Sequence, residues 1–197
     1  MPIAINGSGT VTGISVGGLP DGIVDTDMLA NNAVTAAKST GLGISVADQW
    51  RLTSDFSVND TDSLITSNLE RVDTSGQGTI GTAMSESSGV FTFPSTGIYK
   101  VDFQFNAYAT GDRRYIGGRI QVTTNNSSYA RITDSSDGIS VPATSSWGTG
   151  MTSSLIDVTD TSNVKVKFEC YSHNESFFKG DSTQNKTFMT FVRLGDT

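Results

Sequence analysis

The sequence predicts an all-β protein, and three observations lead to that prediction. Val, Ile, Thr, Phe and Tyr, which favour strands, are plentiful, whereas the helix formers Glu, Lys and Leu are few. Apolar and polar residues alternate with a period of two in many segments after residue 43. Stretches rich in Gly, Asn, Asp and Ser, which favour turns, separate these segments. About eight to ten short strands in roughly 150 residues indicate a β-sandwich.

Residues 1–43 differ from the rest of the chain and predict an irregular anchor or stalk. Glycines interrupt short apolar runs throughout this stretch, and no run is long enough to bury a face of its own. Acidic residues precede Met28 and a lysine stands at position 38, which suits a short helix over residues 28–38. We therefore expect a Gly-rich N-terminal anchor or stalk at residues 1–43 and a sandwich head at residues 44–197.

The clearest strand of the head is expected at residues 98–107. Its apolar side chains point to one side and its polar side chains to the other, as in a strand with one face in water. The apolar set is Val101, Phe103, Phe105 and Ala107, and the polar set is Lys100, Asp102, Gln104 and Asn106. This segment therefore predicts one face of the core.

A second alternating run, at residues 164–170, places the single cysteine, Cys170, on its apolar side with Val164, Val166 and Phe168. This position predicts a buried, structural thiol. The remaining strands are expected at residues 49–56, 64–72, 90–93, 115–123, 129–133, 154–158 and 187–194. Turns are expected at residues 124–127 and 134–138, where Asn, Asp, Ser and Gly gather.

The last strand carries large apolar groups on both faces. Phe188, Thr190, Val192 and Leu194 share one face, and Met189, Phe191 and Arg193 share the other. If the face with Phe188 fills the core, the face with Met189 and Phe191 needs a cover. A second subunit and the chain's own loops are equally good explanations from periodicity alone.

Charge and composition exclude several classes of protein. The formal net charge of −7 repels phosphate backbones, so no nucleic-acid partner is expected. No apolar run approaches the roughly 20 residues of a membrane span, so no membrane insertion is expected. The N-terminus lacks the basic and apolar regions of a signal peptide. One cysteine cannot form an internal disulfide, so packing or oligomerisation must stabilise the fold.

Catalytic and metal sites find little support in the sequence. No nucleophile-elbow motif accompanies the single histidine, His173, so no catalytic residues and no enzyme activity are expected. A lone His and a buried Cys do not make a zinc site. Asp-rich segments at residues 60–62, 134–137 and 157–160 offer oxygen ligands for calcium, but solvated turns are the favoured interpretation. No cofactor is expected.

Residues 89–103, GVFTFPSTGIYKVDF, resemble a known strand-turn-strand motif. It belongs to the globular head shared by complement's collagen-tailed recognition component and tumour necrosis factor (TNF). Residues 188–191 are similar to the final strand of that head. The resemblance covers about residues 44–197 and implies a ten-stranded TNF-like jelly roll that assembles as a homotrimer, with its C-terminal strand near the threefold axis. The chain departs from the family in lacking a collagen-like Gly-x-y stalk.

The N-terminal segment supplies a second resemblance. GSGTVTGISVGGLPDG (residues 7–22), VDTDMLA (residues 24–30) and NAVTAAK (residues 32–38) resemble repeats in the fibre and spike proteins of tailed bacteriophages, notably marine and cyanobacterial phages. This resemblance implies a virion protein assembled in the host cytoplasm, whose N-terminus docks on other virion structural proteins. The anchor residues would be Leu19, Ile23, Met28 and Leu29.

Together these observations predict a non-enzymatic virion protein, a short trimeric tail or capsid fibre that displays a jelly-roll head. The predicted trimer interface consists of Met189, Phe191 and Phe188. Contact with a host-surface glycan or protein is predicted in the loop before the last strand, at His173, Phe177 and Phe178. The alternative is a secreted or intracellular lectin-like module that binds a ligand through the TNF-like fold.

Overall fold

The computed structural model describes residues 4–5, 11–12, 43–141 and 144–197. The chain divides into two units, Met1–Leu42 and Gly43–Thr197. In the first unit, the two-residue strands β1 (Ala4–Ile5) and β2 (Val11–Thr12) pair in antiparallel fashion. The helix expected at residues 28–38 lies outside the described residues, as do the expected anchor residues Leu19, Ile23, Met28 and Leu29. The anchor and its boundary at residue 43 therefore stay predictions.

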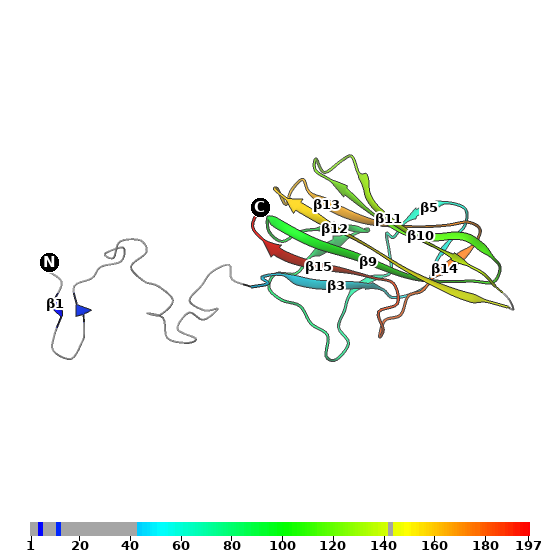
Figure 1. The fold of residues 1–197 in the computed structure, drawn as a ribbon, viewed down its shortest axis with the longest axis horizontal. Helices are drawn as coiled ribbons and strands as arrows, with labels where there is room; N and C mark the ends of the chain where they lie inside the picture. The colour runs from blue at the N-terminus through cyan, green and yellow to red at the C-terminus, as the bar shows by residue number, and fades with distance from the viewer. Residues whose placement is uncertain (1–3, 6–10, 13–42, 142–143) are drawn as a thin grey trace. The chain divides into compact units, whose positions relative to one another are not determined.

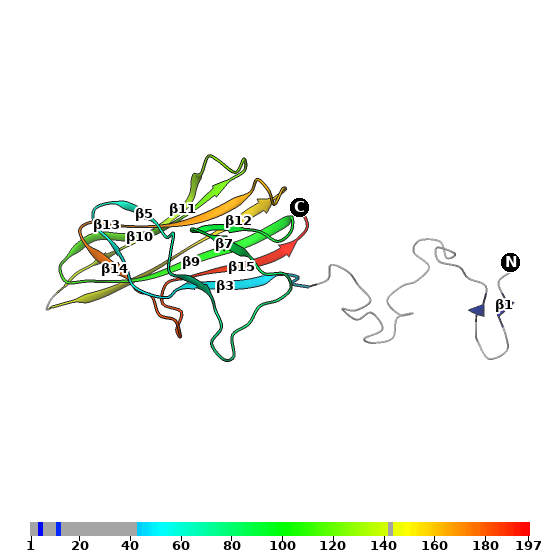
Figure 2. The ribbon, with the colours of Figure 1, turned by 180° about the vertical axis from the view of Figure 1, so that it is seen from behind.

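The second unit, the head, is a sandwich of two antiparallel sheets (Figures 1 and 2). In the larger sheet the order is β12-β9-β15-β3-β6, and β14 pairs with β9 beyond the end of β15 and with β4 on its other side. Its strands are β3 (Ala47–Leu52), β4 (Phe56–Val58), β6 (Leu69–Arg71), β9 (Gly97–Ala109), β12 (Ser146–Val158), β14 (Ser176–Phe178) and β15 (Phe188–Gly195).

The smaller sheet has the order β11-β10-β13-β8-β7, and β5 pairs with β13 next to β8. Its strands are β5 (Asp62–Leu64), β7 (Ser85–Ser87), β8 (Val90–Thr92), β10 (Arg113–Thr123), β11 (Ala130–Ile139) and β13 (Lys165–Ser172). The all-β prediction is confirmed. Thirteen strands form the head instead of ten, because short segments such as β4, β5 and β7 pair beside the long strands.

The two sheets enclose a core rich in phenylalanine. The rings of Phe91 and Phe168 from the smaller sheet approach Phe191 of the larger sheet, with centroid distances of 5.2 Å for Phe91 and 5.9 Å for Phe168. Phe103 of β9 lies 5.2 Å from Phe168 across the same interface. Aromatic pairs at these separations and tilts add to the stabilisation from buried area. In the described part of the chain, no helix is long and apolar enough to cross a membrane.

The two alternating strands of the sequence analysis lie as predicted. The apolar set of β9, from Val101 to Ala107, is fully buried, and its polar set lies on the outer face. Cys170 of β13 is fully buried and unpaired, and burial raises the pKa of its thiol well above the ordinary value. A neutral, buried thiol is a packing group, not a nucleophile.

Gly97, at the start of β9, confirms the turn that its motif predicted. Its φ of +136° lies where side chains are disfavoured, and a Cβ atom there would lie 2.4 Å from the carbonyl oxygen of Gly195. The turn after Pro94 thus brings the start of β9 directly beside the end of β15, as the register between Ile98 and Gly195 also shows.

Three local predictions are wrong. Residues 64–72, expected as one strand, divide between the end of β5 in the smaller sheet and β6 in the larger sheet. Residues 134–138, expected as a turn, form the second half of β11 and pair with β10. Strand β15 has its faces reversed, because Met189 and Phe191 are fully buried in the core and Phe188 and Val192 lie on the outer face. The prediction failed because β15 carries large apolar groups on both faces, so alternation alone does not identify the core face.

Candidate functional site

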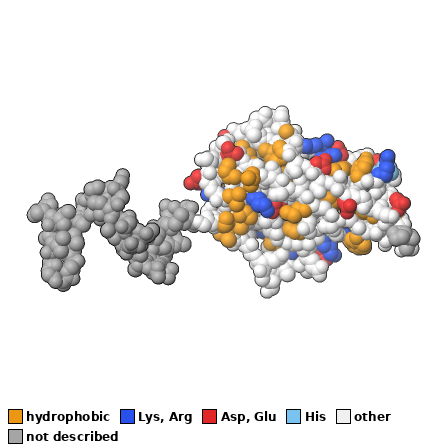
Figure 3. All heavy atoms as spheres, viewed as in Figure 1, with side chains coloured by type: hydrophobic (Ala, Val, Ile, Leu, Met, Phe, Trp, Pro, Cys, Tyr) orange, Lys and Arg blue, Asp and Glu red, His pale blue; other side chains and the backbone are white. Residues whose placement is uncertain are grey.

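The outer face of the larger sheet carries the most exposed apolar side chains of β12. Trp147, Met151 and Leu155 alternate with inward residues along this strand, and their exposed fractions are 58%, 51% and 64%. Single exposed apolar groups are ordinary, but a row on one sheet face is typical of an interaction surface. Figure 3 shows hydrophobic side chains over the part of the head where Figure 1 places β9 and β15.

The register extends this row across the sheet. Leu155 pairs with Lys100 of β9, and Lys100 pairs with Val192 of β15. Directly paired residues place their side chains on the same face, within contact distance. Lys100 lies between these two apolar residues, and its charge is neutralised by Asp102, whose Oδ2 lies 2.7 Å from Lys100 Nζ. We call this surface, made by the outward side chains of β12, β9 and β15, the apolar face, after the apolar side chains on β12 and β15. The outward side chains of β9 between them are polar from Lys100 to Asn106.

An aromatic row crosses one end of the apolar face. The ring of Tyr108 lies between Trp147, at a centroid distance of 5.5 Å, and Phe177 of β14, at 5.2 Å. Lys179 Nζ lies 5.3 Å from the Tyr108 ring, within the range of a cation–π contact. Rigid aromatic groups of this kind are enriched at the centre of protein interfaces.

The three residues predicted to contact a receptor do not form one surface. Phe178 is fully buried and packs on Phe105 with a centroid distance of 5.8 Å, so the prediction for Phe178 is wrong. Phe177 is half-buried in the aromatic row of the apolar face. His173 lies at the end of β13 in the other sheet, where its ring packs on Tyr115. Phe177 and Phe178 separate because successive side chains of a strand point to opposite faces, and His173 lies outside β14.

The predicted trimer residues also separate. Met189 and Phe191 are fully buried within a single copy of the chain, so neither offers surface to a second copy. Phe188 lies on the apolar face, where it pairs with Gln104. The assignment of Met189 and Phe191 to an exterior face is therefore wrong, while that of Phe188 stays a prediction.

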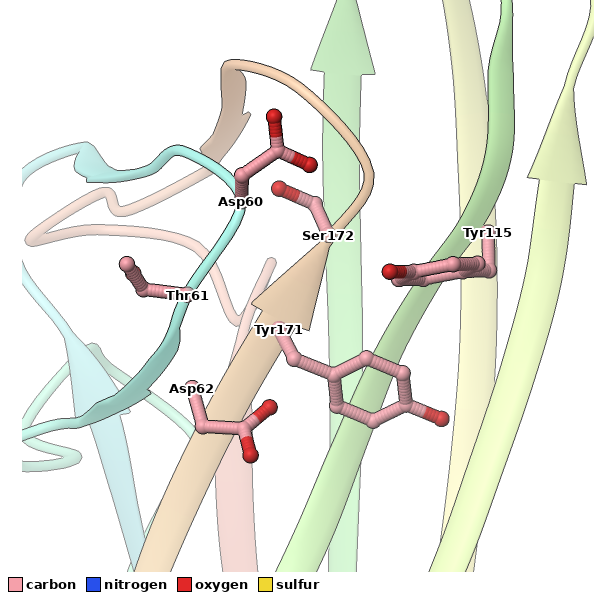
Figure 4. Close-up of a pocket in the computed structure, with 6 residues that line it drawn as sticks. All are labelled: Asp60, Thr61, Asp62, Tyr115, Tyr171 and Ser172. Carbon is pink, nitrogen blue, oxygen red and sulfur yellow. The ribbon is translucent and has the colours of Figure 1, made fainter.

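The smaller sheet carries a different feature on its outer face, a polar groove. Two adjoining cavities of about 190 Å³ and 330 Å³ share three lining residues. The first is lined by Asp60, Thr61, Asp62, Tyr115, Tyr171 and Ser172, and the second adds Arg119 and Ser136. In Figure 4, residues 60–62 form one side, Tyr115 stands on the other, and Tyr171 and Ser172 of β13 lie between.

An ion network fixes the groove on the side of residue 62. Arg119 Nη1 lies 2.8 Å from Asp62 Oδ1 and 2.9 Å from Glu169 Oε1, and its Nε donates to Asp134 at 2.6 Å. Burial acts to raise the pKa of Asp62, but hydrogen bonds from Arg119 and Arg131 outweigh burial and lower it. Asp62 is therefore ionised and held in place at neutral pH.

Tyr171 forms the floor of the groove. The Arg119 guanidinium lies 3.7 Å from the centre of its ring, and its hydroxyl donates to Asp134. Gly117 of β10 makes room for this ring, because a Cβ atom there would lie 2.1 Å from Tyr171 Cζ. Burial and the bond to Asp134 raise the pKa of Tyr171 to about 12, so its phenol stays protonated.

No protein-family model matches this sequence, and no curated protein matches it. Among solved structures, the Eiger TNF of S. frugiperda superposes with a TM-score of 0.58 and 11% identity over 77% of this chain and 94% of that chain. Murine APRIL at pH 8.0 superposes with a TM-score of 0.54 and 11% identity over 76% of this chain and 98% of that chain. The head has a TNF-like jelly-roll fold. At this identity the likeness concerns the fold alone.

In the described part of the TNF-like head, His173 lacks the hydrogen-bond partners of a catalytic relay. Its ring Nδ1 lies 3.2 Å from Asn174 Nδ2, and no serine or carboxylate among the described residues bonds to the ring. Among the same residues, no group of three or more His, Cys, Asp or Glu side chains is arranged to hold a metal. Of the Asp-rich segments considered for calcium, Asp134 is occupied by Arg119 and Tyr171.

Sequence reasoning missed the groove of the TNF-like head. From the sequence, residues 60–62 are expected as a solvated turn and residues 115–123 as an ordinary strand. One signal was available, the Gly117-Gly118 pair inside a predicted strand, since glycine within a strand often marks a close approach of another group. Which group approaches depends on the pairing of β10 with β13, and this pairing cannot be predicted from either segment alone.

Proposed function

We propose that this protein is a non-enzymatic homotrimer in which three TNF-like heads associate through the apolar face. The row of exposed side chains at Trp147, Met151 and Leu155 is the observation that carries this proposal. Burying a large apolar side chain contributes roughly 1.5–3 kcal/mol, and each of three copies supplies the row once. A closed ring of identical subunits covers such a face without leaving an open end.

We further propose that the trimer is a short fibre or spike of a tailed phage, carried on residues 1–43 and directed at the host surface. The support for this step is the likeness of residues 7–38 to phage fibre repeats. Finding no trace of the chain by mass spectrometry of purified phage particles would contradict it. The groove on the smaller sheet equally supports the alternative, a ligand-binding module, because both proposals need a recognition site on the head.

The trimer is tested by placing a charge in the apolar face. Leu155→Asp should convert the full chain from a trimer to a monomer, because a carboxylate is costly to bury in an apolar interface. Lys100, which is opposite residue 155 in the register, is already neutralised by Asp102. Sedimentation velocity gives the mass directly. Ile132→Asp is the matched control, since Ile132 is an exposed apolar residue of β11 in the other sheet, 43% exposed. A monomeric wild type, or an unchanged trimer in Leu155→Asp, would contradict the proposal.

A further inference from the structure

We propose that the groove on the smaller sheet binds a single neutral pyranose sugar, which makes it the glycan-recognition site of the head. The inference rests on the proposed attachment function and gives it a ligand class and a place. The place differs from the predicted receptor loop, although His173 borders it through its contact with Tyr115.

The lining chemistry matches a ligand with many hydroxyl groups. Every residue of the first cavity carries a side-chain oxygen, from two carboxylates, two phenols and two aliphatic hydroxyls. The Ser172 hydroxyl is already bonded to backbone carbonyls and that of Tyr171 to Asp134, so the other four residues are the ones that can bond to a ligand. Asp60 Oδ1 accepts the backbone N–H of Asn174 at 3.0 Å, and no described residue bonds to Oδ2. A free carboxylate oxygen held in place accepts strong hydrogen bonds from neighbouring sugar hydroxyls.

Tyr115 supplies an apolar surface beside these oxygens. It is 40% exposed and its ring centre lies 5.8 Å from that of Tyr171, which is held down by Arg119 and Asp134. The C–H face of a pyranose ring packs on the face of an aromatic ring, while its hydroxyls reach polar groups at the rim. A tyrosine at a solvent-exposed pocket can make both contacts, because its ring packs on the C–H face and its hydroxyl bonds to a sugar hydroxyl.

Charge selects a neutral ligand over an anionic one. Asp60 and Asp62 place two carboxylates along one side of the groove. The two cations beside Asp62 are Arg119 and Arg131, and both are already paired with Asp62 and Glu169. Arg119 also pairs with Asp134, so acidic side chains of the head already neutralise the cationic charge next to the groove. An acidic sugar would meet like charges within a few ångströms, which disfavours binding.

Size and position fit the end of a glycan chain. The first cavity, about 190 Å³, has room for one sugar ring, and the adjoining space of about 330 Å³ lets a following residue leave along the sheet. The groove lies on the outer face of the smaller sheet, and the apolar face lies on the outer face of the larger one. Association through the apolar face therefore leaves the groove open.

Saturation-transfer NMR on the full chain tests the proposal, with the methyl glycosides of glucose, galactose and mannose as probes and N-acetylneuraminic acid as the anionic comparison. At least one neutral glycoside should bind with a dissociation constant on the order of 1 mM, as expected for a small ligand. Tyr115→Ala and Asp60→Asn should each weaken binding at least tenfold. Asparagine suits position 60, whose φ is +48°.

Tyr129→Ala is the matched control, because Tyr129 lies beside Lys167 of β13 and does not line the groove. It should bind as the wild type does, with all variants showing the wild-type melting transition. The proposal is overturned if no neutral glycoside binds, if the acidic sugar binds more tightly, if both groove variants bind normally, or if only calcium chloride perturbs the groove. The monomeric Leu155→Asp variant should still bind, which separates failure of the trimer from failure of the groove.

Discussion

Glycine 117 shows how one absent side chain shapes the groove. The Tyr171 ring lies where a Cβ atom of residue 117 would stand, and from that position its hydroxyl reaches Asp134. The ring in turn supports the Arg119 guanidinium. The geometry of the groove therefore depends on a hydrogen atom at position 117, a dependence that no property of Tyr171 itself reveals.

Gly117→Ala should displace the Tyr171 ring and destabilise the head by about 1–3 kcal/mol, the usual cost of forcing extra volume into a packed site. Urea denaturation followed by tryptophan fluorescence measures this change. Gly138→Ala is the matched control, because the nearest atom to its new Cβ would be 3.6 Å away, an ordinary contact. Equal stability of the two variants would contradict this prediction, because it would mean that the Tyr171 ring can move aside without cost.

The ion network gives Asp62 a stabilising role that depends on pH. Its pKa in the folded chain is lowered, so its contribution is full above the unfolded pKa of about 4 and is lost as pH falls through the folded value. Asp62→Asn should therefore be less stable than the wild type at pH 7, and the difference should shrink below pH 4. Denaturation midpoints between pH 2 and pH 7 test this, and a constant difference would contradict it.

At the scale of single elements, alternation predicted some strands well and failed on others for a physical reason. Strand β9 and strand β13 contrast an apolar face with a charged face, so only one orientation places their charges in water. Strand β15 has apolar groups on both faces, and its period of two cannot tell which face is the core. The acidic and Ser-rich residues of β11 resemble a turn in the sequence. They form a strand in which Asp134 pairs with Arg119 of β10, a partner that is not visible in the local sequence.

The reversed faces of β15 lead to a direct test. Phe191→Ala should destabilise the head by about 3–5 kcal/mol, as expected for a large side chain removed from a packed core. Phe188→Ala removes the same group from the outer face and should cost about 1 kcal/mol. Chemical denaturation in the monomeric Leu155→Asp background isolates folding from association. A larger loss of unfolding free energy for Phe188→Ala than for Phe191→Ala would support the opposite orientation, with Phe188 in the core.

At the scale of the whole molecule, the head contains a complete core of its own. The buried hydrophobic cluster runs from Val46 to Phe191 and joins both sheets. Deleting residues 1–42 should therefore leave a head that unfolds in a single cooperative transition and keeps its oligomeric state, measured by calorimetry and sedimentation. The deleted chain should no longer be incorporated into particles. Incorporation at the wild-type level would contradict the anchor function of the N-terminal segment.

The sequence predicts the sandwich, and its motif at residues 89–103 indicates the TNF-like fold. It predicts neither the apolar face nor the groove. Apolar alternation predicts which side chains avoid water, and this is enough to define a core. The apolar face consists of residues that break that rule along β12, and the groove depends on the pairing between β10, β13 and β5. Both are properties of sheet order, which local patterns do not determine.

The opposite placement of the two outer faces has a consequence for binding strength. If three heads associate through one face, all three grooves stay exposed, and the glycan chains of one dense coat can fill more than one groove of the same trimer. After the first groove binds, the others search at an effective concentration set by the rigid spacing of the heads, and avidity can exceed single-site affinity by about 10²–10⁴. A millimolar sugar site would then hold firmly on a dense surface and release readily from a sparse one.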